Sequence, residues 1–202
     1  MKLKIVEKSI LLGLVLTILL TMTGFTYRCE SISDRVFRLH VLANSDSDED
    51  QALKLKVRDR MLEFTEGKFD CIRTRDEAME IAQSHLDELC RVAQQEVYDE
   101  GYDYPVKVEI TNMYFNTRVY DTVTLPAGRY DALRVTIGEA KGKNWWCVMF
   151  PPMCLPAAEE SKELGDVLDD SQMDVVQGGQ KYEVKFKVVE WFEEIKNWFS
   201  SF

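Results

Sequence analysis

The first hydrophobic pattern along the chain is an uncharged apolar run over residues 10–22, which three lysines precede. A positive flank followed by such a run is typical of an export signal. The uncharged stretch over residues 9–25 is slightly shorter than the ~20 residues that a spanning helix needs, and no A-x-A cleavage motif follows it. We therefore expect residues 1–26 to be a signal peptide or a signal anchor, with the rest of the chain extracytoplasmic.

Strict alternation of side chains over residues 35–43 predicts a strand. One of its faces is wholly apolar and is expected to cover the core. The other face carries Arg38 and His40, which we expect to be wetter.

The acidic segment at residues 44–50 reads Asn-Ser-Asp-Ser-Asp-Glu-Asp, and side chains of these types favour turns and cap helix donors. A helix with apolar residues at helical spacing is predicted to follow over residues 48–66. The segment also begins like a calcium-binding loop, but Gln51 and Val57 stand where that loop needs Gly and Glu. We therefore interpret it as a helix cap.

A second amphipathic helix is predicted from Thr74 to a natural stop at Gly101. Thr74 and Glu77 form a capping-box pattern at its start. His85 lies on the margin of its apolar stripe, where a surface position is expected.

Three further strands are predicted. Residues 105–110 alternate as a half-exposed strand, and residues 113–125 and 129–137 flank Pro126-Ala127-Gly128, which favours an antiparallel hairpin. The expected fold class is α+β, in which two helices pack on a mainly antiparallel sheet of about four strands. We assign this domain to residues 34–156.

The segment at residues 144–154 holds two Trp, one Phe and two Met, an apolar load that must be covered. Its Pro-Pro pair ends any regular element and turns the chain. That turn can bring Cys147 and Cys154 together, either as a disulfide or as packed thiols.

The C-terminal part divides into two segments. Residues 157–180 are acidic and poorly patterned, which favours a linker. Residues 181–202 predict an amphipathic helix with a strong apolar stripe that either docks on its own domain or engages a membrane interface or a partner. The stripe comprises Val184, Val188, Trp191, Phe192, Ile195, Trp198 and Phe199.

Charge and motifs limit the possible functions. A net charge of −10 and a pI near 4.8 disfavour nucleic acid or an anionic lipid surface as the main partner of the folded part. No nucleophile elbow, phosphate-binding loop, dinucleotide motif or zinc spacing occurs in the sequence. A Cys147 nucleophile served by His40 or His85 is the catalytic alternative, an extracytoplasmic thiol-dependent hydrolase or oxidoreductase.

Three segments occur in an order that points to a known family. Residues 38–51 read Arg-Leu-His-Val-Leu-Ala-Asn-Ser-Asp-Ser-Asp-Glu-Asp-Gln, and residues 55–59 read Leu-Lys-Val-Arg-Asp. Together they resemble the N-terminal motif of the stage II sporulation protein R family. Residues 125–130, Leu-Pro-Ala-Gly-Arg-Tyr, and residues 144–152 are similar to its other two motifs.

The resemblance implies a protein secreted from the forespore into the space between the two septal membranes of an endospore-forming bacterium. There the family acts as a signal rather than an enzyme. It triggers a membrane-embedded aspartic protease of the mother cell, which then processes the precursor of an early mother-cell sigma factor. No cofactor, metal or nucleic acid is expected, and an uncleaved N-terminus would hold the chain to the membrane. The candidate partner-binding residues are Arg38, Asn44, Asp46, Asp48, Asp50, Trp145 and Trp146.

Overall fold

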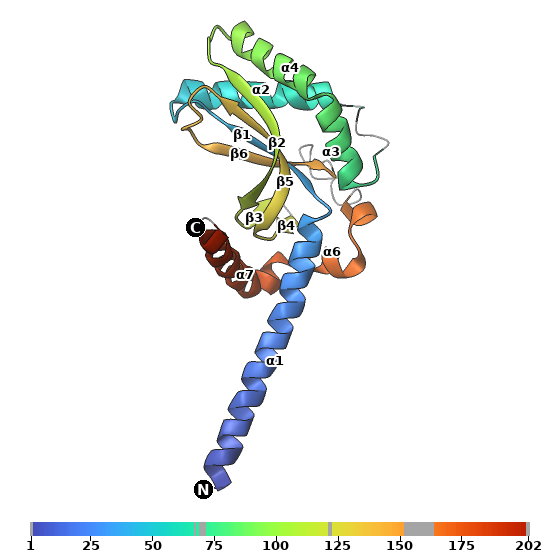
Figure 1. Cartoon of the computed structure of the whole chain (residues 1–202), viewed down its shortest axis with the longest axis vertical. Coiled ribbons are helices and arrows are strands. Elements are labelled where there is room, and N and C mark those ends of the chain that lie inside the picture. The colour runs from blue at the N-terminus through green and yellow to red at the C-terminus, as the bar shows by residue number, and fades with distance from the viewer. Residues whose placement is uncertain (1, 67, 69–71, 121–122, 152–163, 201–202) are drawn as a thin grey trace.

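A mixed four-stranded sheet lies between two layers of helices in the computed structural model, which describes residues 2–66, 68, 72–120, 123–151 and 164–200 (Figure 1). The strands are β1 (Phe37–Leu42), β2 (Val106–Phe115), β5 (Gly128–Ile137) and β6 (Asn144–Phe150), in the order β2-β5-β1-β6. β1 runs parallel to β5, whereas the β1–β6 and β2–β5 pairings are antiparallel. The α+β class and the mainly antiparallel sheet are confirmed.

One face of the sheet is covered by α2 (Asp48–Thr65), α3 (Arg75–Ser84) and α4 (Leu86–Asp99). Helix α2 begins where the sequence predicts, because the Ser47 hydroxyl accepts a hydrogen bond from the Asp50 amide and caps the first turn. The core of this layer joins the helices to alternate residues of β1. Its members include Phe37, Leu39, Val41, Leu53, Val57, Met61, Leu89 and Val97.

The expected single helix after Thr74 is divided at His85, whose φ of −107° and ψ of 12° leave the helical range. The bend allows α3 to lie against β1 while α4 packs on α2 and β2. His85 is half-buried at this bend, as expected for a residue on the helix margin.

The predicted hairpin around residues 126–128 is only partly right, because within its first strand, residues 113–125, only residues 113–115 pair antiparallel with β5. β5 pairs with β2, with Phe115 opposite Gly128, and the intervening chain forms its own small hairpin of β3 (Arg118–Tyr120) and β4 (Val123–Leu125). β4 departs from the sheet because Val123 and Leu125 are buried in a second core. This second core also contains Phe25, Phe115, Tyr130, Val148, Val175 and Phe186. Residues 123–125, which directly precede the predicted turn, therefore pair with β3 and not with β5.

A second helical layer packs against part of the other face, which was expected to be wet. It contains the end of α1 (Lys2–Ser33), α6 (Asp170–Gln177) and α7 (Gly179–Ser200), with β4 beside them. Arg38 and His40 are 0% and 3% exposed, so the expectation of a wet face is wrong. Aromatic rings cover both side chains: those of Phe115, Tyr120 and Tyr130 at Arg38, and those of Phe115 and Trp146 at His40.

The linker expected over residues 157–180 differs from the structure in its described part. α6 begins with a capping box at Asp169 and buries Val175 and Val176, and Leu164 and Leu168 join the same core. Residues 157–163 lie outside the described residues. The acidic composition marks the outer surface of this segment, whereas its few aliphatic residues fix it to the domain.

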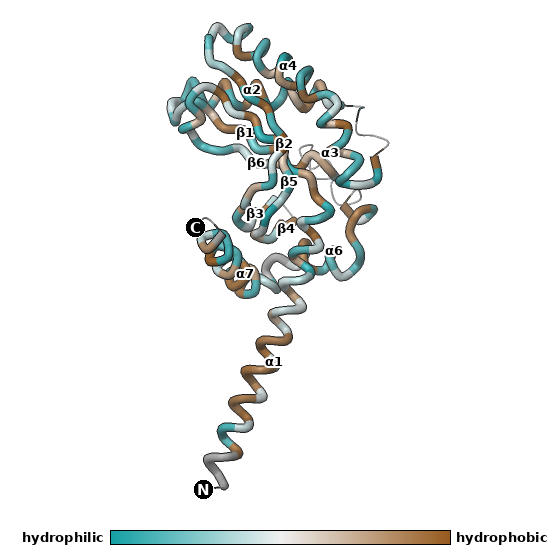
Figure 2. Tube along the Cα trace, in the orientation of Figure 1, coloured by the Kyte–Doolittle hydropathy of each residue, from teal (hydrophilic) through white to brown (hydrophobic). Residues whose placement is uncertain are grey.

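Helix α1 projects from the domain body, and its outer part is strongly hydrophobic (Figures 1 and 2). By length and composition, the segment Val6–Ser33 could cross a membrane. An 18-residue window within it has a mean hydropathy of 2.0, and 6% of that window is buried. The last turns differ, because Phe25, Cys29 and Ile32 recur at helical spacing and are buried in the second core. The outer part of α1 is therefore an exposed apolar helix, and its last turns belong to the core of the domain.

Helix α7 docks on its own domain, but not through the stripe that the sequence analysis singles out. Tyr182, Phe186 and Val189 are buried, and the rings of Tyr182 and Phe186 pack against Phe25 with centroids 5.3 and 5.4 Å away, the first tilted and the second edge-on. The expected stripe is left exposed on the opposite side.

Candidate functional site

Residues 44–50 form an acidic rim at the end of β1, and the structure divides its side chains into two kinds. Asp46 and Asp48 are exposed, Asn44 is half-buried, and Asp50 is only 4% exposed. The Asp50 carboxylate accepts hydrogen bonds from the Asn44 amide at 2.9 Å and from the Ser45 hydroxyl at 2.5 Å. Asp50 therefore holds the turn together, while Asp46 and Asp48 face solvent.

The acidic rim is braced by the loop between β5 and β6. The Lys143 amide donates to Asp46 at 2.7 Å, and the Glu139 amide donates to the Asn44 side-chain oxygen at 2.9 Å. Gly142 lies so close that a Cβ there would meet the Ser45 carbonyl oxygen at 2.1 Å, so only glycine allows this approach. Side chains that the sequence suggests for binding thus also fix two loops to each other.

The contribution of Asp50 to the stability of the acidic rim depends on whether its carboxyl group is ionised. Burial on its own would raise the pKa of this carboxyl, but hydrogen bonds from Ser45, Asn44 and Tyr104 outweigh it and lower the pKa below its ordinary value of 3.8. The ionised form is therefore the one that the fold stabilises.

Asp50→Asn is expected to lower the free energy of unfolding by about 1–3 kcal/mol at neutral pH, because buried donors then face a weaker acceptor. A group with a depressed folded-state pKa stabilises the fold above its unfolded pKa, and this stability is lost as pH falls through the folded value. The difference in unfolding free energy between wild type and variant should thus be fully present above pH 3.8 and become smaller below it. Chemical unfolding of both proteins across pH measures it. The exposed Asp48→Asn is the matched control, and an equal loss in both variants would contradict the division of the rim.

Arg38 lies in a cluster of aromatic rings that the second helical layer covers. Its guanidinium carbon is 4.1 Å from the ring centroid of Phe115 and 4.9 Å from that of Tyr130, and Nη2 donates to the Tyr120 hydroxyl at 2.5 Å. Among the described residues, Nε and Nη1 have no hydrogen-bond partner. A buried cation stacked on rings is a packing element here, and its side chain is out of reach of a partner at the surface.

Both Arg38→Met and Arg38→Ala should lower the free energy of unfolding, and the loss should be about 2–3 kcal/mol smaller for Arg38→Met. Methionine fills most of the volume and removes an incompletely paired charge, whereas alanine leaves a cavity between the rings. Denaturant midpoints of the two variants give the comparison. Equal losses would show that the charge, and not the packing, is what the cluster needs.

Trp145 and Trp146 point to opposite faces of the sheet. Trp146 lies in the aromatic cluster, 5.5 Å from Phe115 between ring centroids, with the Arg118 guanidinium 3.8 Å above it. Trp145 packs against the α2–α4 layer beneath Arg58, at 4.3 Å. Both rings are half-buried and residues 147–151 are buried, so the expectation that this segment is covered is confirmed for its described part.

The geometry for a thiol nucleophile is not formed with His40. In the β1–β6 register Cys147 pairs with Leu39 and His40 with Trp146, so the two side chains point to opposite faces. Cys147 is disulfide-bonded, and Cys154, its expected partner, lies outside the described residues, so that pairing stays a prediction. His40 instead contacts the Asn144 side-chain oxygen at 2.6 Å, and burial lowers its pKa.

His85 is also occupied by local contacts, since its Nδ1 lies 3.0 Å from both the Ser84 hydroxyl and the Ile81 carbonyl oxygen. Within the described ranges, no group of three or more His, Cys, Asp or Glu residues is placed to hold a metal ion.

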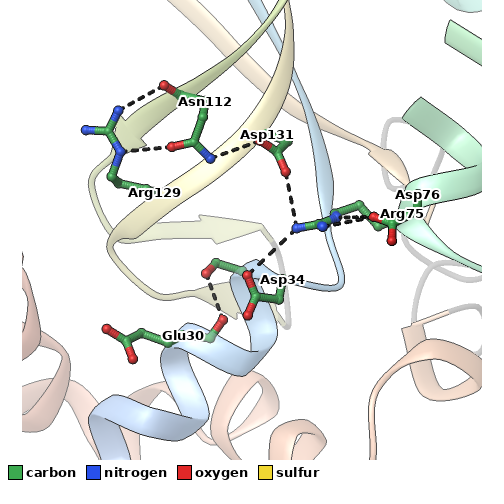
Figure 3. A network of polar contacts seen from close by, with 8 residues as sticks. Glu30, Asp34, Arg75, Asp76, Asn112, Arg129 and Asp131 are labelled. Atoms are coloured by element: carbon green, nitrogen blue, oxygen red, sulfur yellow. Dashed lines mark hydrogen bonds and ion pairs between the residues drawn. The ribbon is translucent and has the colours of Figure 1, made fainter. Parts of the chain in front are cut away.

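A polar network ties the end of α1 to the sheet and to α3 (Figure 3). The Arg75 guanidinium, in the first turn of α3, lies 3.2 Å from Asp131 on β5 and 3.7 Å from Asp34 just after α1. Asp131 also accepts a hydrogen bond from the Asn112 amide at 2.9 Å. The network links the end of α1 to β5 and to the start of α3.

The sequence alone does not predict this polar network at the end of α1. Its members are polar and charged residues from the end of α1, α3, β2 and β5, and nothing in their spacing links them. The burial of Phe25, Cys29 and Ile32 does leave a signal, because their spacing of four and three residues continues a helix past the uncharged run.

Comparisons with known proteins agree with the motifs. The family model described as stage II sporulation protein R matches residues 33–160, which span β1 to the end of β6. Stage II sporulation protein R of Bacillus subtilis (strain 168) is 32% identical over 185 residues, covering 81% of this chain and 83% of that protein. No solved structure matches the chain. With the family model covering most of the domain and the relative covering most of the chain, this protein belongs to the stage II sporulation protein R family.

Proposed function

We propose that this protein is a signal of sporulation that crosses the septal intermembrane space and activates a membrane-embedded aspartic protease of the mother cell. Activation leads to processing of an early mother-cell sigma factor precursor. The single observation that carries the proposal is membership of the family, which matches over the folded domain rather than over an isolated motif. The apolar N-terminal helix is compatible with export and with attachment to the membrane.

The arrangement of the domain supports signalling to a facing membrane. β1 starts soon after the end of α1 and ends at the acidic rim, so a six-residue strand separates the two. At ~3.3 Å per residue the strand places the rim on the order of 20 Å from the C-terminal end of α1. A protein held by α1 would thus present Asp46 and Asp48 on the side away from its own membrane.

Exposed charge on the acidic rim suits a recognition surface. Asp46, Asp48 and Glu49 are all exposed, and Asp48 and Glu49 lie in the first turn of α2. Rim charges steer encounter and fix orientation more than they add affinity. We propose that these carboxylates meet a basic surface of the protease.

The proposal is tested by producing the full exported chain in a host cell that carries the protease and its sigma factor precursor, and measuring precursor cleavage. Cleavage that depends on the chain supports it. The catalytic alternative is tested in the same cells with His40→Gln and His85→Gln, which keep polar side chains at both sites. Cleavage that persists in both fits a ligand, whereas cleavage lost in either folded variant would favour an enzyme. Equal cleavage with and without the chain would overturn the proposal.

A further inference from the structure

Helix α7 carries two apolar faces, of which only one is used by the fold. The docked face holds Tyr182, Phe186, Val189 and Glu193, at intervals of four, three and four residues, and all four are buried. The outer face comprises Val184, Val188, Trp191, Phe192, Ile195, Trp198 and Phe199. Tyr182 and Val184 are two residues apart, which on a helix is about 200°, so the two faces are opposite.

The outer face is large and strongly exposed. Trp191 is 64% exposed, and Trp198 and Phe199 are 57% and 67% exposed. Side chains of this size, contiguous on a helix surface, lose hydrophobic free energy in water, and such patches mark interaction sites. Trp in particular favours the boundary between lipid headgroups and acyl chains.

The position of α7 identifies what covers this face. Figure 1 shows α7 at the end of the body from which α1 projects. Tyr182 and Phe186 on its docked face pack against Phe25, and the Lys196 ammonium lies 3.2 Å from Glu30. Phe25 and Glu30 both belong to α1 and follow its exposed apolar part. Arg129 of β5 also donates to Asn197 at 3.0 Å, so α7 is held along its length. If the apolar part of α1 lies in a bilayer, α7 is at its surface.

We propose that α7 lies in the interface of the membrane that holds α1, with its outer face inserted among the lipids. The charges of the helix are balanced, with four Lys and four Glu within residues 181–196, so apolar insertion and not attraction to anionic lipid supplies the affinity. The pair of helices then fixes the tilt of the domain on the membrane. This inference rests on the placement of α1 in a bilayer and goes beyond the proposed protease activation.

The sequence offers a direct reporter. The chain has four Trp, at positions 145, 146, 191 and 198, and α1 contains none, so the anchor helix is silent in tryptophan fluorescence. The full chain is reconstituted in phosphatidylcholine vesicles whose acyl chains are brominated near the headgroup end, and emission is compared with that in unbrominated vesicles. We expect bromine to quench the wild-type protein.

The double variant Trp191→Phe, Trp198→Phe keeps the outer face apolar and should lose at least half of the bromine-dependent quenching. Bromine near the middle of the bilayer should quench the wild type less, because the helix lies at the interface. Equal quenching in wild type and variant would overturn the proposal. So would a blue-shifted emission of Trp191 and Trp198 without bromine quenching, since a second copy or another protein would then cover the face. Adding anionic lipid should leave the quenching unchanged, and quenching that required it would overturn the charge-independent insertion.

Discussion

Phe25→Ala is expected to lower the free energy of unfolding of the domain by about 3–5 kcal/mol. The ring is fully buried between α1 and α7, against Tyr182 and Phe186, and its removal leaves a cavity that rigid helices fill poorly. The full chain in mild detergent, followed by near-ultraviolet circular dichroism in denaturant, gives the measurement.

Leu14→Ala is the matched control, because Leu14 lies on the same helix and is 58% exposed. It should leave the unfolding midpoint of the domain nearly unchanged. If both variants behave alike, the end of α1 contributes nothing to the core. If only Phe25→Ala is destabilised, a cleavage of the chain beyond Phe25 would also weaken the fold, which favours an uncleaved anchor.

Asp48→Lys is expected to reduce the initial rate of precursor cleavage by about tenfold when the chain is limiting. The change reverses an exposed charge at the acidic rim, and a tenfold loss corresponds to ~1.4 kcal/mol of partner binding. The helix dipole interaction lost at the first turn of α2 is only ~0.3–1 kcal/mol, so the domain should stay folded.

Glu80→Lys provides the control for this reversal. Glu80 is exposed on α3, which lies on a different part of the same helical layer, and the substitution changes the net charge by the same amount. It should leave cleavage close to wild type. Equal losses from both changes would show that overall charge, and not the acidic rim, controls activation.

Local sequence patterns are sufficient to predict those elements that are determined by residues close to them in the sequence. The alternation in β1 and the Ser47 cap of α2 belong to this class, and the structure has both where the pattern indicates. The tryptophan segment is likewise a strand whose rings are packed against neighbouring layers.

The second helical layer could not be predicted, because its parts carry patterns that suggest other roles. The end of α1 continues an export signal, α6 lies within an acidic segment, and α7 docks through its less obvious face. Arg38 shows the consequence. Alternation places it opposite the apolar side of β1, but the rings that bury it come from residues 115–130, which only the tertiary fold brings near.

The candidate site was predicted in part for the same reason. Exposure of Asp46 and Asp48 follows from a polar turn, whereas burial of Asp50 depends on donors from Asn44, Ser45 and Tyr104 folding around it. The sequence shows that these residues cluster, but not which of them are free to touch a partner. Only the structure shows that Asp50 is used within the turn, that Asp46 both faces solvent and braces the neighbouring loop, and that Asp48 faces solvent.

Direct contact between the acidic rim and the protease is the claim on which this account depends. A photo-cross-linking amino acid placed at position 48 of the full chain, in cells that carry the protease and its precursor, tests it most directly. The account predicts a covalent adduct with the protease from position 48 and none from position 80, with cleavage retained by the position 80 variant. An adduct from position 80 alone, or undiminished cleavage with no adduct from position 48, would contradict it.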